Sequence, residues 1–456
     1  MSISAIAGVL ALNFWFLAVG VAVLFGLRGW RSWGELGRLA GLGYMLGVAA
    51  MGVAWVWLLT IDVDLSLATI FGSGAVIGAA GWTVGLRVGR RLPARPTFRT
   101  PAPSPSIVAA LVGGLTVVLL EGLFRAGRLA GLYEFDGWAF WVPKAKAIYY
   151  FGGLDHQFFH DLPGQSYPPL VPALEAATFH FMGSPDVVTL HLQFWFLLAG
   201  FVGAVIGLLS GRVPALLLWP PVLLVLVTPH VVGYALQPQA DFLLDELVAL
   251  GVLLVALWLM ERDDWALWGA TLVLAAAMLT KREGYVFAAC IVAAALITDL
   301  GRGRASSLKL VIAGLVAVAA TVPWRVVLAV RDLSGGGPEA GGTGLLSNLD
   351  RAWPSLRLAL SALFDFHIWL VVLPLLVLVV ILAFAGGERR LSIFAAFLCV
   401  LCLAGLTWST WAFPSLPITK EPALNPIVRF SGGLVLSAAS LVPLLLAGAA
   451  QARELR

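Results

Sequence analysis

Long runs of apolar residues alternate with short polar segments along almost the whole chain. Each run holds about 16–24 residues, and about 20 apolar residues are enough for a helix to cross the hydrocarbon core of a bilayer. The pattern therefore predicts an all-α, polytopic bundle of about thirteen transmembrane helices. The predicted spans lie near 3–26, 39–60, 65–86, 106–124, 187–209, 214–230, 241–260, 265–280, 284–299, 308–330, 366–385, 391–412 and 428–449.

Composition excludes a soluble protein of this length. Hydrophobic residues make up 60% of the 456 residues and charged residues only 12%, about half the share found in soluble domains. The 18 Trp against 7 Tyr fit anchoring at a membrane interface. The net charge of +4 is explained by loop arginines, so we expect membrane lipids and not nucleic acid as a partner.

The polar segments fall into two alternating sets. One set is short and basic and carries 17 of the 29 Lys and Arg residues, which places it in the cytoplasm by the positive-inside rule. The other set is acidic, aromatic or long. Thirteen spans then put the N-terminus outside and the C-terminus in the cytoplasm of a cell (plasma) membrane. The second set comprises 61–64, 125–186, 231–240, 331–365 and 413–427.

Three regions are predicted. Residues 1–105 form three N-terminal transmembrane helices followed by a Pro- and Arg-rich cytoplasmic linker, since five prolines between 93 and 105 disfavour helix. Residues 106–330 form a second transmembrane module with a long outer loop at 125–186. Residues 331–456 hold a Gly-rich outer loop, a candidate lid, and the C-terminal transmembrane helices.

A charged tripeptide interrupts the apolar region between 261 and 309. Glu261–Asp264 and the segment 301–309 both belong to the basic, cytoplasmic set, so the chain must cross the membrane an even number of times between them. Lys281-Arg282-Glu283 is then the tip of a hairpin of two short helices on the outer side. Charges at such a depth are costly unless they face water, protein or lipid phosphate.

The outer loop after the fourth span carries an acid ahead of an aromatic segment, Asp136-Gly-Trp-Ala-Phe-Trp. Helical spacing puts Trp138, Trp141 and Ala145 on one face, which favours helices lying in the interface plane. Tyr167-Pro-Pro then forces an extended turn. Asp136 is thereby placed at the boundary between water and lipid, where a reaction on a lipid head group would need a carboxylate.

Three motifs together resemble one enzyme family. Asp136-Gly-Trp-Ala-x-Trp-x-x-Lys-Ala-Lys, followed by Tyr167-Pro-Pro-Leu-x-Pro, is similar to the first outer loop of the GT-C-fold glycosyltransferases that depend on polyprenyl-phosphate sugars. Gly233–Asp241 resembles the segment with their second outer acid, and Lys281-Arg-Glu-Gly resembles the tip of their short-helix hairpin. The likeness covers roughly residues 106–330. In that family the catalytic loop usually follows the first span, whereas in this chain three additional spans come first.

The resemblance implies an inverting transfer of sugar from a polyprenyl-phosphate donor to a hydroxyl of a glycan, lipid or protein at the extracytoplasmic face. By this resemblance we expect Asp136 to be the catalytic base and Asp241 to orient the acceptor. Lys281, Arg282 and Arg429 bind the donor phosphate. The supporting residues are Glu283, Lys144, Tyr167 and Asp245.

Simpler roles compete with these assignments. Asp136 and Asp241 could be helix N-caps, and Lys281 and Arg282 could extend towards lipid head groups. Lys144 or Lys146 could lie on a solvated face. Asp245 and Glu246, deeper in the seventh span, are expected to pair with a basic group from another span, because isolated charge is expensive there.

No required cofactor is expected, although two outer carboxylates could bind a divalent cation. The histidines show neither HxH nor HExxH spacing, which argues against a metal site. Two other functions remain open: a lipid-linked glycan ligase with a pyrophosphate donor, and a transporter of lipid or glycan without covalent chemistry.

Overall fold

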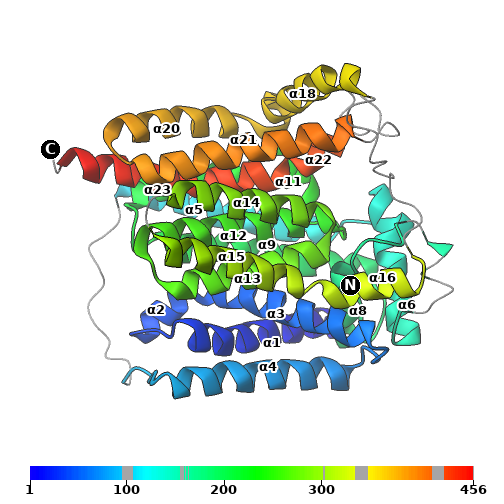
Figure 1. The fold of residues 1–456 in the computed structure, drawn as a ribbon. Coiled ribbons are helices and arrows are strands. Elements are labelled where there is room, and N and C mark those ends of the chain that lie inside the picture. The colour runs from blue at the N-terminus through cyan, green and yellow to red at the C-terminus, as the bar shows by residue number, and fades with distance from the viewer. Residues whose placement is uncertain are drawn as a thin grey trace.

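The computed structural model describes residues 1–94, 106–154, 159, 161–162, 164–300, 303–333, 348–412 and 426–454. All regular elements in these ranges are helices, which confirms the all-α prediction (Figure 1). Most of the predicted Pro-rich linker, at 95–105, and the predicted Gly-rich lid lie outside the described residues.

Nine helical segments of the described chain are long and apolar enough to cross a membrane, or ten if one bent pair is a single span. The protein is therefore a multi-pass membrane protein. The bent pair, Leu349–Trp369 with α20 (Val372–Gly386), turns by 108° at its break. The nine segments are α1 (Ile3–Leu27), α3 (Ala40–Thr60), α4 (Leu67–Arg87), α5 (Ile107–Gly127), α9 (Val187–Leu209), α12 (Ala240–Glu261), α15 with α16 (Arg304–Ala319 and Val322–Val330), α21 (Arg389–Trp411), and α22 with α23 (Pro426–Phe430 and Gly432–Glu454).

Each of the thirteen predicted segments coincides with a helix or with two consecutive helices, and three of the single helices are short. They have 12, 17 and 17 residues, at or below the shortest length that usually spans a bilayer. The count of thirteen is thus not established by length and composition. The three are α10 (Ala215–Leu226), α13 (Asp264–Thr280) and α14 (Glu283–Asp299).

The remaining helices are shorter connections or lie at the ends of the bundle (Figure 1). They are α2 (Trp33–Arg38), η1 (Gly137–Trp141), α6 (Val142–Phe151), α8 (Leu170–Met182), α11 (Pro229–Tyr234), α18 (Leu349–Leu363) and α19 (Phe366–Trp369).

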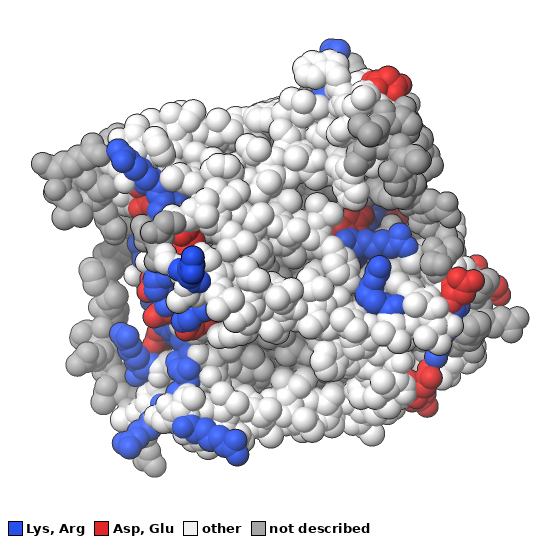
Figure 2. Space-filling view, in the orientation of Figure 1, with Lys and Arg blue, Asp and Glu red and all other residues white. Residues whose placement is uncertain are grey.

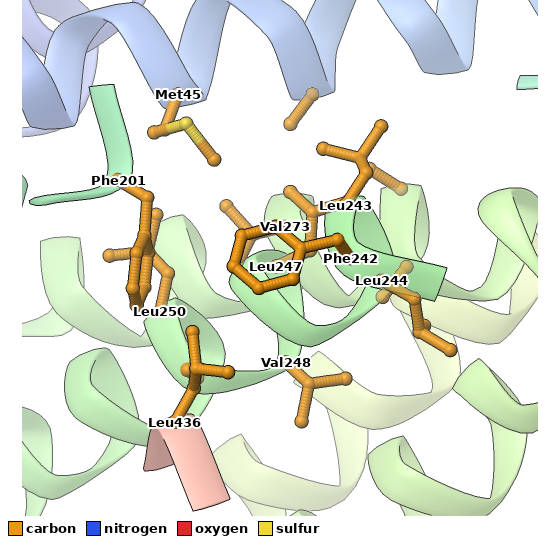
Figure 3. Packing of buried hydrophobic residues seen from close by; sticks show 14 of the residues in the cluster. Met45, Phe201, Phe242, Leu243, Leu244, Leu247, Val248, Leu250, Val273 and Leu436 are labelled. Carbon is orange, nitrogen blue, oxygen red and sulfur yellow. The ribbon is translucent and has the colours of Figure 1, made fainter. Parts of the chain in front are cut away.

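Helix α12 forms the centre of the bundle. Every residue in its most apolar stretch is buried by protein, against 11% in α4 and 17% in α5. Figure 3 shows side chains from four neighbouring helices around Phe242 of α12: Met45 of α3, Phe201 of α9, Val273 of α13 and Leu436 of α23. A helix covered on all sides is held in place from every direction, so its first turn is a firm platform for a site.

Helices α1 and α3 cross closely because glycine lies at the contact. A Cβ on Gly20 would lie 1.7 Å from the carbonyl oxygen of Gly43, and one on Gly47 would lie 2.0 Å from that of Phe16. Small residues let membrane helices approach through their backbones, which is the main source of packing energy in lipid. α3 also packs against α9 and α13, so the N-terminal helices join the main bundle.

Charged side chains gather at the two ends of the bundle (Figure 2). We call the end where α12 finishes and α13 begins the basic end; it holds an ion-pair network in which Arg262 and Arg390 both bind Asp299. We call the opposite end, where α12 begins and α13 finishes, the site end. α6 and α8 also lie there (Figure 1).

Candidate functional site

Four charged side chains from separate parts of the chain meet at the site end. Arg429 of α22 donates hydrogen bonds to Oδ2 of Asp136, which precedes η1, and to Oδ2 of Asp241 at 2.6 Å. Lys281, between α13 and α14, donates to Oδ1 of Asp241 at 2.6 Å. We call Asp136, Asp241, Lys281 and Arg429 the charge cluster. The expected convergence of these residues is therefore present in the structure.

Local backbone geometry places Asp241 and Lys281. Asp241 lies in the first turn of α12, two residues after the extended residue Gln239. Lys281 is itself extended and ends α13. The chain can reverse there because Gly284 has no side chain: a Cβ at this position would lie 2.4 Å from the carbonyl oxygen of Ala277. The tight hairpin thus brings Lys281 back beside the start of α12.

Burial makes the ion pairs necessary. The side chains of Asp241 and Lys281 are 3% exposed, whereas those of Asp136 and Arg429 are 14% and 26% exposed. Two carboxylates face two cations, so the charge cluster is electrically balanced, as buried charges must be. Burial would lower the pKa of Lys281, but the carboxylates of Asp241 and Glu283 outweigh it and raise that pKa above the usual value. Lys281 is accordingly a fixed cation.

The helix-cap alternative does not hold for either acid. Asp136 precedes η1 in helical conformation and makes no capping hydrogen bond, and α12 is preceded by Gln239 rather than by Asp241. Both carboxylates instead bind Arg429. Their orientation is set by tertiary contacts.

Aromatic rings surround the cations. Lys281 Nζ lies 5.0 Å from the ring centre of Phe430 and 5.8 Å from that of Tyr167, and the Arg282 guanidinium lies 5.6 Å from Tyr167. Tyr167 is stacked on Phe140 with ring centres 6.0 Å apart and planes 6° apart. We call Phe140, Tyr167 and Phe430 the aromatic wall. Such cation–π contacts stabilise positive charge away from bulk water.

Lys144 lies behind the aromatic wall and not on a solvated face. Its side chain is 1% exposed, its Nζ donates to the carbonyl oxygen of Gly164 at 2.5 Å, and it lies 5.7 Å from the ring of Phe140. Burial, helped by the nearby charge of Arg282, lowers the pKa of Lys144 to about 7. It is a cation that can lose its proton near neutral pH.

The aromatic helix of the outer loop differs from the expected one. Trp141 and Ala145 are buried in protein, whereas Trp138 is 52% exposed, so the three residues do not share a face. The reason is that Gly137–Trp141 is a π-helical turn, whose wider winding rotates Trp138 away from positions three and seven residues later. The expected short helices after the fourth predicted span are present as η1, α6 and α8.

Arg282 and Glu283 flank the charge cluster. Glu283 lies 3.6 Å from Lys281 and so can orient it, as expected. Arg282 forms no ion pair with any residue in the described part of the chain and is partly exposed. A narrow groove, lined by Glu283, Phe287, Cys290, Leu406 and Phe430 among others, runs from this point between α14 and α21.

Two deeper acids lack the expected basic partner. Within the described ranges neither Asp245 nor Glu246 has a cation in ion-pair distance, although both are fully buried in α12. Oδ2 of Asp245 and both carboxylate oxygens of Glu246 have no hydrogen-bond partner in the described part of the chain. Asp245 instead packs against the backbone near Gly432, where a Cβ would lie 1.9 Å from its Oδ2.

Three residues of the site were not expected from the sequence: Glu134, Phe140 and Phe430. Burial raises the pKa of Glu134, and the charge of Arg429 opposes the carboxylates of Asp136 and Asp241, which raise it further. The sequence offered a signal for two of these residues, because Glu134 lies two residues before Asp136 and Phe430 lies beside Arg429. Across the described residues no three His, Cys, Asp or Glu side chains group as a metal site.

Comparisons of the chain with protein-family models, with curated protein sequences and with solved structures give no match. The function therefore has to be argued from the site itself.

Proposed function

We propose that this protein is an integral-membrane glycosyltransferase of the GT-C type that transfers a sugar from a polyprenyl phosphate to an acceptor hydroxyl. One observation carries the proposal. An acid from the outer loop, an acid from α12, a lysine from a hairpin tip and an arginine from the last helix form a single hydrogen-bonded group. By the family resemblance these residues would act as the catalytic base, orient the acceptor and bind the donor phosphate.

The reaction follows from the chemistry of these groups. The acceptor oxygen attacks the anomeric carbon of the sugar, and the bond from that carbon to the phosphate oxygen breaks. Asp136 takes the hydroxyl proton, and the electron pair of the broken bond leaves with the lipid phosphate. General base assistance of this kind is typically worth 10²–10⁴ in rate, and attack opposite the leaving group inverts the anomeric centre.

Cations at the site are suited to the leaving phosphate. Arg282 has no carboxylate partner among the described residues, and an arginine can bind two phosphate oxygens at once. Lys281 and Arg429 already hold carboxylates, so a phosphate would have to share or replace these partners. Release of Asp136 from Arg429 would free the base at the moment the donor is bound.

The groove between α14 and α21 marks where the lipid part of the donor would lie, and because its volume is only about 30 Å³ the two helices would have to move apart to admit it. Its walls are mostly apolar, and it begins at Glu283 and Phe430, next to the proposed phosphate position. An isoprenoid chain lying there would leave its phosphate beside Lys281. In this proposal the chain crosses a plasma membrane thirteen times, with the site end outside and the basic end in the cytoplasm.

The test is transfer by purified protein. We expect one member of a panel of radiolabelled polyprenyl-phosphate sugars to yield labelled acceptor and free polyprenyl phosphate, with chelator and without it in parallel to test the divalent cation. Asp136→Asn should abolish transfer. Glu121→Gln is the matched control, because Glu121 is an acid of α5 that is 51% exposed and pairs with Arg125. Equal activity in both variants would refute the assignment of Asp136.

Asp245 and Glu246 favour one alternative, a transporter that moves lipid or glycan. Acids inside membrane-spanning helices often mark ion or proton pathways, and three carboxylate oxygens of these two acids have no hydrogen-bond partner among the described residues. A transporter would move labelled lipid across a liposome bilayer and leave the sugar–phosphate bond intact. Flipping without product formation would favour this alternative over the transferase.

A further inference from the structure

A cavity of about 620 Å³ opens at the basic end, on the opposite side of the bundle from the charge cluster. Its walls come from the end of α1, the turn into α2, the end of α4 and the start of α13. This volume is in the range of small-ligand sites, about 300–1,000 Å³. Four arginines line it: Arg28, Arg31, Arg90 and Arg91.

Two of these arginines are fixed by the protein. Arg90 donates hydrogen bonds to the carbonyl oxygens of Leu27, at 2.6 Å, and Arg28, and so closes the end of α1. Arg28 binds Glu35 at 2.7 Å and lies over the ring of Trp265 at 5.2 Å. These contacts order the walls without any ligand.

The other two arginines are uncommitted. Arg31 and Arg91 are exposed, and neither makes a side-chain hydrogen bond or ion pair to any described residue. The cavity also has acidic lining, but Glu35 is paired with Arg28, and Asp264 with Lys309 at 2.6 Å. Of the acids that line the cavity, only Asp263 is left to balance the guanidinium groups of Arg31 and Arg91.

Two residues that line the cavity carry unsatisfied donors. Nε of Arg90 and Nε1 of Trp30 are enclosed by protein and have no hydrogen-bond partner among the described residues. Buried donors are normally satisfied. An acceptor-rich ligand would satisfy either donor if the side chain turned towards the cavity.

The positive-inside rule explains why arginines lie at this end but not why they line a cavity. A solvated basic flank needs neither a concave wall nor the indoles of Trp30, Trp265 and Trp268, which also line this space. Arginine forks match phosphate oxygens, and indoles suit the level of lipid head groups.

We infer that this cavity binds an organic phosphate, either the head group of an anionic phospholipid or a soluble phosphorylated compound. The site lies between the N-terminal helices and the α12–α13 turn. The role of the N-terminal helices would then be to form part of this binding site. The inference does not depend on the proposed transferase activity, because it concerns the opposite end of the molecule.

The first arm of the test uses lipid. Native mass spectrometry of the purified protein would compare retention of phosphatidylglycerol with that of phosphatidylcholine. We expect preferential retention of phosphatidylglycerol, weakened about tenfold or more in the double variant Arg31→Gln/Arg91→Gln, since both lost contacts would be charge-assisted hydrogen bonds to phosphate. Arg304→Gln/Arg389→Gln is the control, because both residues are exposed near the same end and outside the cavity lining.

The second arm uses soluble anions in lipid-depleted detergent. Inorganic pyrophosphate should raise the thermal transition of the wild type and of the control, but not of Arg31→Gln/Arg91→Gln, if the ligand is a soluble phosphate. A response in the lipid arm alone identifies a head group. The variant Arg31→Lys/Arg91→Lys, which keeps the charge, should fold normally and bind more weakly than wild type. No response in either arm, or equal loss in the control, would overturn the inference.

Discussion

Replacing the two acids of the charge cluster by asparagine should separate catalysis from stability. Among the described residues of the cluster Asp136 binds only Arg429, and its side chain is 14% exposed. Asp241 binds both Arg429 and Lys281, each at 2.6 Å, and is 3% exposed. Asparagine keeps the shape of either side chain and removes its charge.

The expected magnitudes follow from what each substitution leaves behind. In Asp136→Asn, Arg429 keeps Asp241, so the loss is one charge-assisted bond and the cost is about 1–2 kcal/mol. In Asp241→Asn, buried Lys281 keeps only Glu283, at 3.6 Å, and Arg429 keeps only Asp136. Removing one partner of a buried pair costs about 3–5 kcal/mol.

Turnover should not follow the order expected for stability. Asp136→Asn should lose about 10²–10⁴ in turnover while remaining folded, because it removes the proposed base. The free energy of unfolding can be followed by tryptophan fluorescence in mixed detergent micelles, and turnover by release of polyprenyl phosphate. If Asp136→Asn proves less stable than Asp241→Asn, the charge distribution described above is wrong. If Asp136→Asn turns over normally, Asp136 is not the base.

The remaining predictions concern the surroundings of the cluster. Arg282→Gln should weaken donor binding about tenfold with little change in turnover at saturation, since one arginine–phosphate contact is lost; an unchanged apparent KM would contradict this. Gly164→Ala should reduce activity and stability, because Gly164 has a φ of +64° and a Cβ there would lie 2.5 Å from the ring of Tyr167; normal activity would show that this ring is not needed. Because burial holds the pKa of Lys144 at about 7, the unfolded chain keeps between pH 7 and 10.5 a proton that the folded chain has lost. The free energy of unfolding should therefore rise with pH across that window, by at most about 1.4 kcal/mol per pH unit, and Lys144→Met should abolish this slope. Glu246→Leu should stabilise the protein by about 1–4 kcal/mol, because its oxygens have no partners among the described residues; measured loss of lipid transport would instead indicate a pathway.

The helices could be predicted well from the sequence, and the number of spans less well. Apolar runs located every main helix, because the bilayer selects length and hydrophobicity directly. The same signal cannot tell a short spanning helix from a buried one, and α13 and α14, at 17 residues each, lie at that limit. The π-turn at 137–141 was missed since its sequence is compatible with an ordinary helix.

The members of the site could be predicted from motifs, but not their partners. The order of the predicted spans along the chain placed Asp136, Asp241 and Lys281 at the same end of the bundle. It could not show that Arg429 bridges the two acids, which depends on how α22 packs, nor that Asp245 lies without a cation. Contacts between distant segments are set by tertiary packing and leave no local pattern.

The balance of charge within the cluster constrains how any donor can bind. Asp136 and Asp241 are matched by Lys281 and Arg429, so a phosphate that enters without other change adds an unmatched negative charge to a buried place. Two remedies are available in the structure: the uncommitted Arg282 can approach, or Arg429 can exchange Asp136 for the phosphate. The second remedy exposes the carboxylate that must take a proton, and it does so only when donor is present. A cluster that is neutral and closed at rest would therefore restrict the base to the moment at which an acceptor can be used.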